Sequence, residues 1–105
     1  MLGFAMRAGK VVIGTNQVIA ALQARGAGAV QLVLISSDAS DGTTKKLTFK
    51  CEFYKKTVKR LDIDSSELGR LLGKLYAPAV VAIVDDRFAE EIKRAITPGD
   101  TAAVN

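Results

Sequence analysis

Two short, nearly all-apolar runs set the strongest limit on how this chain can fold. They are Val30–Ser36 (VQLVLIS) and Val80–Val84 (VVAIV), in a chain of 105 residues. A run without polar alternation suits a central strand that is covered on both faces, as in sheets that lie between layers of helices. The two runs therefore predict an α/β protein with two strands buried in the middle of its sheet.

Helical patterns separate these runs from two weaker strands, expected over Val11–Ile13 and Val58–Ile63. The expected helices cover Leu2–Ala8, Thr15–Ala24, Lys45–Lys56, a short leucine-bearing segment after Asp64, and a segment after Asp85 or Asp86. Strands that alternate with helices predict a three-layer α/β/α sandwich with a central sheet of about four strands. No linker or repeat interrupts the pattern. We therefore expect one domain over residues 1–96 and a mobile C-terminal tail over residues 97–105.

Polar residues stand at the expected helix starts, where they can accept hydrogen bonds from free backbone N–H groups. The stretch Asp64-Ser65-Ser66-Glu67 has the spacing of a capping box, with Asp in place of the usual Ser or Thr. The other expected caps are Thr15 or Asn16, Ser40 or Asp41, and Asp85 or Asp86. The polar stretch Ser37–Thr44 is expected to be a loop.

The composition excludes several classes of site. The chain has no His, so it lacks the commonest general base and zinc ligand, and its one cysteine, Cys51, excludes an intramolecular disulfide. Cys51 shares an apolar helix face with Leu47 and Tyr54, which predicts a small core residue. A single cysteine fits a reducing cytoplasm, and the longest apolar run, Ala79–Val84, is far shorter than the ~20 residues of a membrane span. No metal ion, cofactor or membrane contact is expected.

Positive charge is concentrated in one part of the chain. The net charge is +4, and residues 43–60 hold seven Lys or Arg residues against one acid, Glu52. Such a concentration suits a polyanionic partner, although a solvated helix face produces the same pattern.

The turn over Gly9–Asn16 has the glycine spacing of a phosphate-binding P-loop, G-x-x-x-x-G. It lacks the Lys that should follow Gly14, and the chain has no G-x-G-x-x-G fingerprint for a dinucleotide. What remains is a helix start led by Gly14, Thr15, Asn16 and Gln17. Its free N–H groups favour an anion, and its two side-chain amides suit nucleobase edges. An ordinary capped helix is the competing interpretation.

Two loops offer further candidate sites. Ser36–Asp41 follows a strand, where α/β enzymes place catalytic residues, but a serine nucleophile there would lack a His base and an S-x-x-K lysine. We therefore expect this loop to cap the next helix. Lys74–Ala79 carries Leu75 and Tyr76 just before a buried strand. These side chains either stack on a base or fold back onto the core.

Three stretches together resemble the L-seven-Ae family of kink-turn RNA-binding ribosomal proteins. They are GTNQVIAALQARG, VQLVLISSDAS and LGRLLGKLYAPAVVAIV, and SSDASDGTTKKLTFKCEFY is most similar to the bacterial YlxQ-like branch. The resemblance covers residues 2 to about 96 and implies an α/β/α sandwich. It also implies a non-enzymatic ribonucleoprotein component, whose RNA surface joins the helix after G-T-N to the loop after L-G-x-x-x-G.

Carried over by position, the resemblance implies an RNA site made of Gly14, Thr15, Asn16, Gln17, Arg70, Lys74, Leu75 and Tyr76, and we expect Lys10 to join it. The family often has Glu where this chain has Gln17, and Lys where it has Ala20. Gln17 keeps an acceptor without the charge, whereas Ala20 loses the cation. In the implied mechanism the helix N–H groups and Lys10 meet phosphates, and Asn16 with Gln17 reads base edges. The Lys74–Tyr76 loop packs on an extruded base.

Three functions remain open from the sequence. The first is RNA binding by a cytoplasmic monomer, with a kink-turn or related structured RNA, such as ribosomal RNA, as the partner. The second is a protein–protein adaptor on the same fold, which the apolar Leu75-Tyr76 pair and the missing cation at Ala20 motivate. The third is a small enzyme that uses the Ser36–Asp41 loop, although that loop lacks a base.

Overall fold

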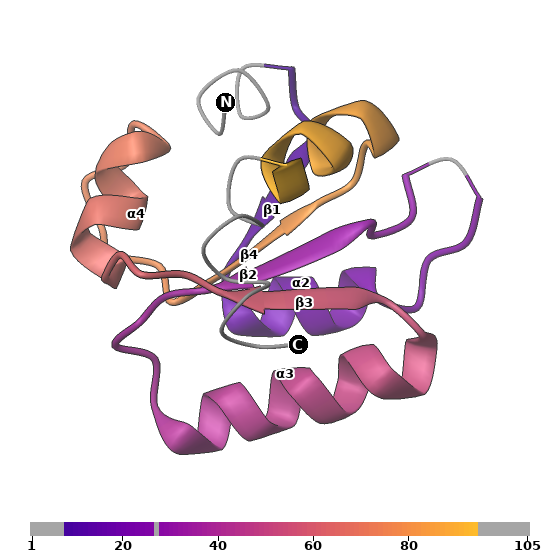
Figure 1. Ribbon diagram of the computed structural model, residues 1–105, viewed down its shortest axis with the longest axis horizontal. Helices are drawn as coiled ribbons and strands as arrows, with labels where there is room; N and C mark the ends of the chain where they lie inside the picture. The colour runs from indigo at the N-terminus through magenta and orange to yellow at the C-terminus, as the bar shows by residue number, and fades with distance from the viewer. Residues whose placement is uncertain (1–7, 27, 95–105) are drawn as a thin grey trace.

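The computed structural model describes residues 8–26 and 28–94, and within them four strands form one mixed sheet (Figure 1). The strands are β1 (Val11–Ile13), β2 (Leu32–Ile35), β3 (Thr57–Arg60) and β4 (Val80–Ile83), in the order β1-β4-β2-β3. β4 pairs antiparallel with both β1 and β2, whereas β3 pairs parallel with β2. The two apolar runs therefore form the two central strands, as predicted.

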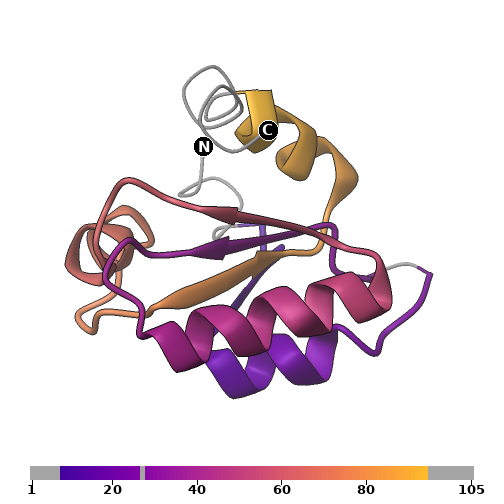
Figure 2. The same cartoon turned by 60° about the horizontal axis from the view of Figure 1, so that its bottom comes forward.

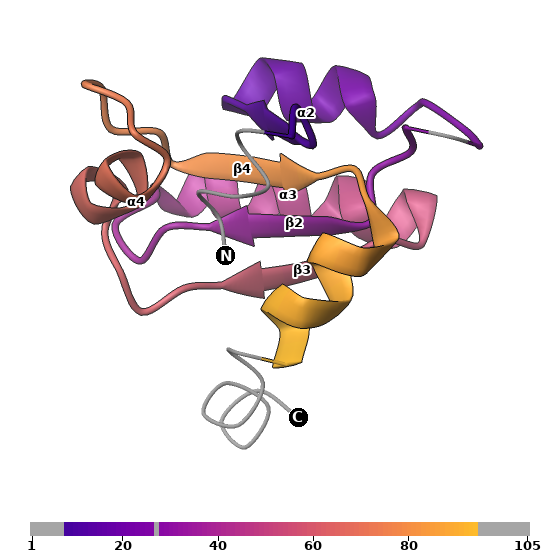
Figure 3. The ribbon, with the colours of Figure 1, turned by 90° about the horizontal axis from the view of Figure 1, so that it is seen from above.

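Helices cover both faces of the sheet, which confirms the predicted α/β/α sandwich. They are α2 (Thr15–Ala21), α3 (Asp41–Tyr54), α4 (Ser65–Leu71) and a last helix described over residues 86–94. α2 and α3 lie together on one face, and the last helix lies on the other (Figure 2). α4 lies at one end of the sheet (Figure 3). No helix within the described residues is both long enough and apolar enough to span a membrane.

Alternate residues of the central strands feed two separate cores, because successive side chains of a strand point to opposite faces. The core under α2 and α3 contains Val18, Leu22, Val33, Ile35, Leu47, Cys51, Val80 and Ala82. The core under α4 and the last helix contains Leu32, Leu34, Leu68, Leu72, Val81, Ile83, Ala89 and Ile92. Every residue of β2 and β4 is buried, so a slip by one register position would exchange the side chains that fill the two cores.

Some predicted boundaries were wrong, and the helix starts explain why. α3 begins at Asp41 rather than Lys45, because the Ser40 hydroxyl accepts a hydrogen bond from the Thr43 N–H at 3.1 Å. The expected Ser37–Thr44 loop is therefore much shorter. α2 ends at Ala21 rather than Ala24, and its N-cap is Gly14, without a side-chain cap from Thr15 or Asn16.

The other expected boundaries concern β3, the last helix and the two ends of the chain. β3 is shorter than the expected strand and begins one residue earlier, at Thr57. The last helix is capped by Asp85, whose carboxylate accepts from the N–H groups of Arg87 at 2.9 Å and Phe88 at 3.1 Å. Nearly all of the expected first helix and the whole expected tail over residues 97–105 lie outside the described residues.

Candidate RNA interface

Gly14 forms the corner between β1 and α2, and it ties this corner to the far part of the chain. Its φ of +104° lies in a region that glycine adopts readily and other residues rarely do. Its N–H donates to the Val80 carbonyl oxygen at 2.9 Å, at the start of β4. Because β4 follows directly on the loop Lys74–Ala79, this bond places the start of α2 beside the base of that loop.

The start of α2 is open to a ligand. The first N–H groups of a helix have no partner within the helix, and here Gly14 supplies no side-chain cap. The first turn also carries no acid, so its positive dipole end is not neutralised from within the helix. Asn16 and Gln17 are exposed, and Thr15 is half-buried. The Gln17 Oε1 lies close over Gly14, since a Cβ built on Gly14 would lie 2.7 Å from it.

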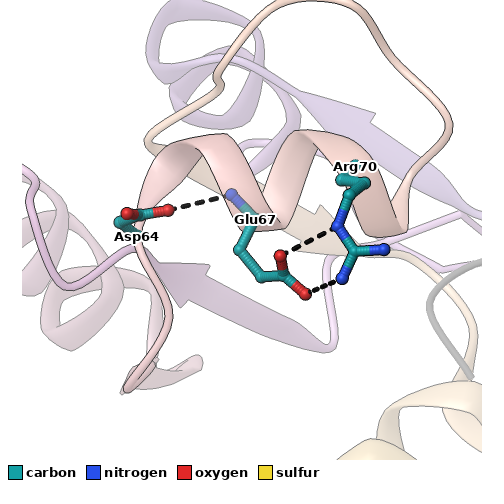
Figure 4. Close-up of polar contacts among 3 residues, drawn as sticks. All are labelled: Asp64, Glu67 and Arg70. Carbon is teal, nitrogen blue, oxygen red and sulfur yellow. Dashed lines mark hydrogen bonds and ion pairs between the residues drawn. The ribbon is translucent and has the colours of Figure 1, made fainter.

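The start of α4 is closed by its own side chains (Figure 4). The Glu67 N–H donates to an Asp64 carboxylate oxygen at 2.9 Å, which forms half of the predicted capping box. The Glu67 carboxylate does not supply the other half, because it pairs with the Arg70 guanidinium through two hydrogen bonds. These bonds lower the pKa of Glu67 and raise the pKa of Arg70. Arg70, which was predicted to bind RNA, is therefore exposed but already paired with Glu67.

The loop Lys74–Ala79 is held to α4 by its backbone and presents Leu75 and Tyr76 to solvent. A Cβ built on Gly69 would lie 2.2 Å from the Tyr76 carbonyl oxygen, so only glycine allows this close approach. The Lys74 N–H donates to the Gly69 carbonyl oxygen at 2.9 Å. Leu75 and Tyr76 are 107% and 57% exposed. The Leu75 and Tyr76 side chains therefore do not fold back onto the core, which was one of the two alternatives, whereas Pro78 at the end of the loop is buried.

Lys10 lies away from the other predicted site residues. Its carbonyl oxygen accepts from the Val84 N–H at 2.9 Å, at the end of β4 opposite to Val80. The strand β1 separates Lys10 from Gly14, and four residues of extended chain span about 13 Å. The structure thus brings together Gly14, the α2 start and the loop, but not Lys10.

In the turn between β2 and α3, Asp38 accepts a set of hydrogen bonds that the sequence did not reveal. The buried Ser36 hydroxyl donates to Asp38 at 2.7 Å, and Asp38 also accepts from the Ser65 N–H and hydroxyl, each at 2.8 Å. These hydrogen bonds lower the pKa of Asp38 and fasten the start of α4 to the end of β2. The loop proposed for an enzyme thus holds α4 in place, and Ser40 caps α3 as expected.

The thiol of Cys51, the one cysteine of the chain, lies in the core. Cys51 is fully buried in the core under α2 and α3, as predicted, and burial raises the pKa of its thiol to about 11. The part of the chain that the structure describes contains no cluster of three His, Cys, Asp or Glu side chains that could hold a metal ion.

Comparison with known proteins places this arrangement among relatives. Residues 1–93 match the family described as "Ribosomal protein L7Ae/L30e/S12e/Gadd45 family". The chain is 45% identical over 92 residues to RNA-binding protein YlxQ of Bacillus subtilis (strain 168), which covers 88% of this chain and 87% of the relative. It is 33% identical over 96 residues to RNA-binding protein YlxQ of Enterococcus faecium, which covers 91% of this chain and 87% of the relative.

Solved structures show the same fold. A Bacillus halodurans protein of unknown function superposes with a TM-score of 0.80 at 38% identity, over 90% of this chain and 91% of the other. The 15.5kD RNA binding protein of Giardia lamblia superposes with a TM-score of 0.74 at 19% identity, over 98% of this chain and 83% of the other. At that identity the second likeness concerns the fold alone.

Proposed function

The chain belongs to the ribosomal protein L7Ae/L30e/S12e/Gadd45 family, and we propose that it is a non-enzymatic RNA-binding protein. Two relatives are named RNA-binding protein YlxQ, and they match almost the whole chain. We further propose that the target is a kink-turn or a similarly kinked internal loop, bound by a cytoplasmic monomer. Such irregular sites suit protein recognition better than a regular RNA duplex, whose base edges are poorly accessible.

One observation carries the proposal: the Gly14 N–H bond to Val80 joins an uncapped helix start to an exposed apolar loop. The two parts offer different chemistry. The helix start offers N–H donors and a positive dipole end to phosphate oxygens. Leu75 and Tyr76 offer apolar and aromatic surface to a base that has left the stack. A bent RNA with an extruded nucleotide presents both partners within a short distance.

Each exposed side chain at the helix start has a role in this proposal. Asn16 and Gln17 carry amides that both donate and accept, so they can pair with base edges. Tyr76 stacks on the extruded base, and base–aromatic stacking is worth about 1–3 kcal/mol. The family often has a Lys where this chain has Ala20, so base-edge contacts and stacking must supply more of the affinity here.

The cations contribute less directly than the sequence suggested. Arg70 must exchange Glu67 for a phosphate if it is to contact RNA. Lys10 lies about 13 Å along the strand from Gly14 and can act on the same RNA only through its field or a distant phosphate. Lys74 is half-buried at the base of the loop and is the nearest cation in sequence to Leu75 and Tyr76.

The proposal is tested by binding to two matched RNAs. The first contains a kink-turn, and the second has the tandem G·A pairs of that kink-turn replaced by Watson–Crick pairs. We expect the protein to bind the first at least tenfold more tightly at the same salt concentration, because only the first kinks. Equal affinities would contradict kink-turn recognition.

The adaptor function remains the second candidate, because one observation favours it. Leu71, Leu75 and Tyr76 are exposed large hydrophobic side chains near one another in sequence, and such surface is typical of protein contacts. If this function is correct, RNA-free protein should show no salt-dependent binding to any structured RNA.

A further inference from the structure

The outward face of α3 carries two exposed aromatic rings that the proposed interface does not use. Phe49 and Phe53 are 65% and 70% exposed, although phenylalanine is usually buried. They stand four residues apart and so share one helix face. Leu47 and Cys51 occupy the opposite face and are fully buried. Within the described residues, Phe49 and Phe53 therefore leave well over half of their surface to solvent.

Cations surround these rings. Lys45 and Lys46 precede Phe49 by about one turn, and Lys50 lies beside it on the same helix. Glu52 is the one acid among residues 43–60. The two ion pairs found in the described residues, Arg70–Glu67 and Lys93–Glu90, use none of these lysines.

The Phe53 ring also lines a groove at the C-terminal end of α3. The groove has a volume of about 410 Å³ and separates α3 from the segment that follows α2. Its lining includes Arg25, Phe53, Tyr54, Lys55 and Lys56. The Phe53 and Tyr54 rings meet edge to face, with centroids 5.0 Å apart, so they present a fixed aromatic wall beside three cations.

We propose that this surface, made of the outward face of α3 and the adjoining groove, binds a single-stranded segment of RNA. Single-strand binding surfaces combine a positive track for the backbone with aromatic rings on which bases stack. Both features occur here on one helix about 20 Å long, which is enough for several nucleotides. A protein partner with an apolar anchor would leave the surrounding lysines desolvated and unpaired, whereas a polyanion satisfies rings and cations together.

The inference rests on the proposed function in that RNA is the partner, but it does not depend on kink-turn recognition. The α2 start and the loop lie at the end of the sheet where β4 begins. The groove lies at the other end, beside the C-terminal ends of α2 and α3. One RNA can therefore place its structured part at the first surface and a single-stranded flank along α3.

The experiment compares three RNAs by fluorescence anisotropy at fixed salt: a kink-turn, the same kink-turn with a twelve-nucleotide single-stranded extension, and oligouridylate of that length. The wild-type protein should bind the extended RNA at least fivefold more tightly than the unextended one. The double variant Phe49→Ala, Phe53→Ala should lose this advantage and its affinity for oligouridylate, while it keeps its affinity for the unextended kink-turn. The variant Phe49→Tyr, Phe53→Tyr should keep both, because it retains the rings.

Matched controls separate this surface from the first. Tyr76→Ala should weaken binding to the kink-turn but not to oligouridylate. Lys46→Gln with Lys50→Gln should flatten the salt dependence of oligouridylate binding, whereas Arg87→Gln, an exposed cation on the last helix, should not. Thermal melting followed by circular dichroism checks that each variant is folded.

Two outcomes overturn the inference. One is unchanged affinity of the double alanine variant for the extended RNA and for oligouridylate. The other is self-association of the wild-type protein that the same substitutions abolish, because the surface would then bind a second copy. If ring-dependent oligouridylate binding persists while kink-turn discrimination fails, the kink-turn proposal fails and this inference stands.

Discussion

α2 and α4 are both seven residues long, both begin at the same end of the sheet, and yet they treat their N-termini in opposite ways. α4 uses the Asp64 carboxylate to accept its own free N–H and places Glu67 in its first turn. α2 has Gly14 at the cap and no acid in its first turn. The start of α2 is therefore left without a side-chain acceptor or a negative charge of its own, whereas the start of α4 has both. α4 instead acts as the support to which the loop is fastened.

The largest effect is expected from breaking that support. Gly69→Ala puts a methyl group 2.2 Å from the Tyr76 carbonyl oxygen, so the loop must move. Overpacking of this kind costs about 1–3 kcal/mol, more than the ~1 kcal/mol that alanine gains over glycine within a helix. We expect kink-turn affinity to fall by at least tenfold and the melting temperature to fall.

Gly42→Ala is the matched control for this substitution. Gly42 lies in the first turn of α3, where an added Cβ meets nothing within 4 Å. It should raise the free energy of unfolding by up to ~1 kcal/mol and leave RNA affinity unchanged. Unaltered affinity in Gly69→Ala would show that the position of the loop does not matter for binding.

The next effect tests the open helix start. Asn16→Ala removes an exposed amide that we expect to read a base edge, and such a contact is worth about 1–3 kcal/mol. Affinity for the kink-turn should fall about tenfold, whereas affinity for the Watson–Crick-paired RNA should change less. Thermal unfolding should be nearly unchanged, because Asn16 caps nothing. An equal loss for both RNAs would place Asn16 among the non-specific contacts.

How far the sequence predicts these two helices differs between them. The apolar runs, the Asp64 cap and the buried Cys51 follow from local patterns, so the fold and most helix positions could be predicted. Local patterns also suggested a Thr15 or Asn16 cap for α2. The chain instead reaches α2 through Gly14, whose conformation depends on the pairing of β1 with β4.

The contacts that assemble the candidate site are long-range, and this is why the sequence could not reveal them. The fit of Tyr76 against Gly69 depends on how the loop returns to α4, and its only local sign is a glycine inside a helix. The hydrogen bonds that Ser65 donates to Asp38 join two turns that are far apart in the chain. Lys10 was expected to meet phosphates together with the N–H groups of the α2 start, although an extended strand separates it from Gly14.

A smaller effect should come from opening the α4 start, so that it resembles α2. Asp64→Ala removes the acceptor for the Glu67 N–H, and loss of a helix cap costs about 0.5–2 kcal/mol. Chemical denaturation should show this decrease in the free energy of unfolding. RNA affinity should change by less than twofold if α4 serves only as support. A gain in RNA affinity would mean that an uncapped α4 also attracts the backbone.

The smallest effect concerns the pair that occupies Arg70. Glu67→Gln removes the carboxylate and frees the guanidinium for a phosphate, so RNA affinity should rise about twofold and the salt slope by about one ion. The pKa of Glu67 is lowered in the folded state, so its ionised form stabilises the fold. That contribution is complete above its ordinary pKa of 4.5 and is lost as the pH falls through the lower folded value.

Melting curves of wild type and Glu67→Gln between neutral pH and about pH 3 measure that contribution. The wild type should lose more melting temperature than the variant over the acid part of this range. Parallel curves would show that the pair with Arg70 has no effect on folding stability.

The proposed RNA interface depends on the pairing of β1 with β4, so it is complete only when this edge of the sheet is folded. The bond from Gly14 to Val80 closes a loop that includes most of the described chain, and β1 is a three-residue edge strand that can detach before the centre of the sheet. A chain that has lost β1 keeps most of its core but no longer holds the helix start beside the loop. Free RNA at a concentration one hundred times its Kd would raise the free energy of this opening by about 2.7 kcal/mol. An RNA ligand would therefore stabilise the pairing of β1 with β4.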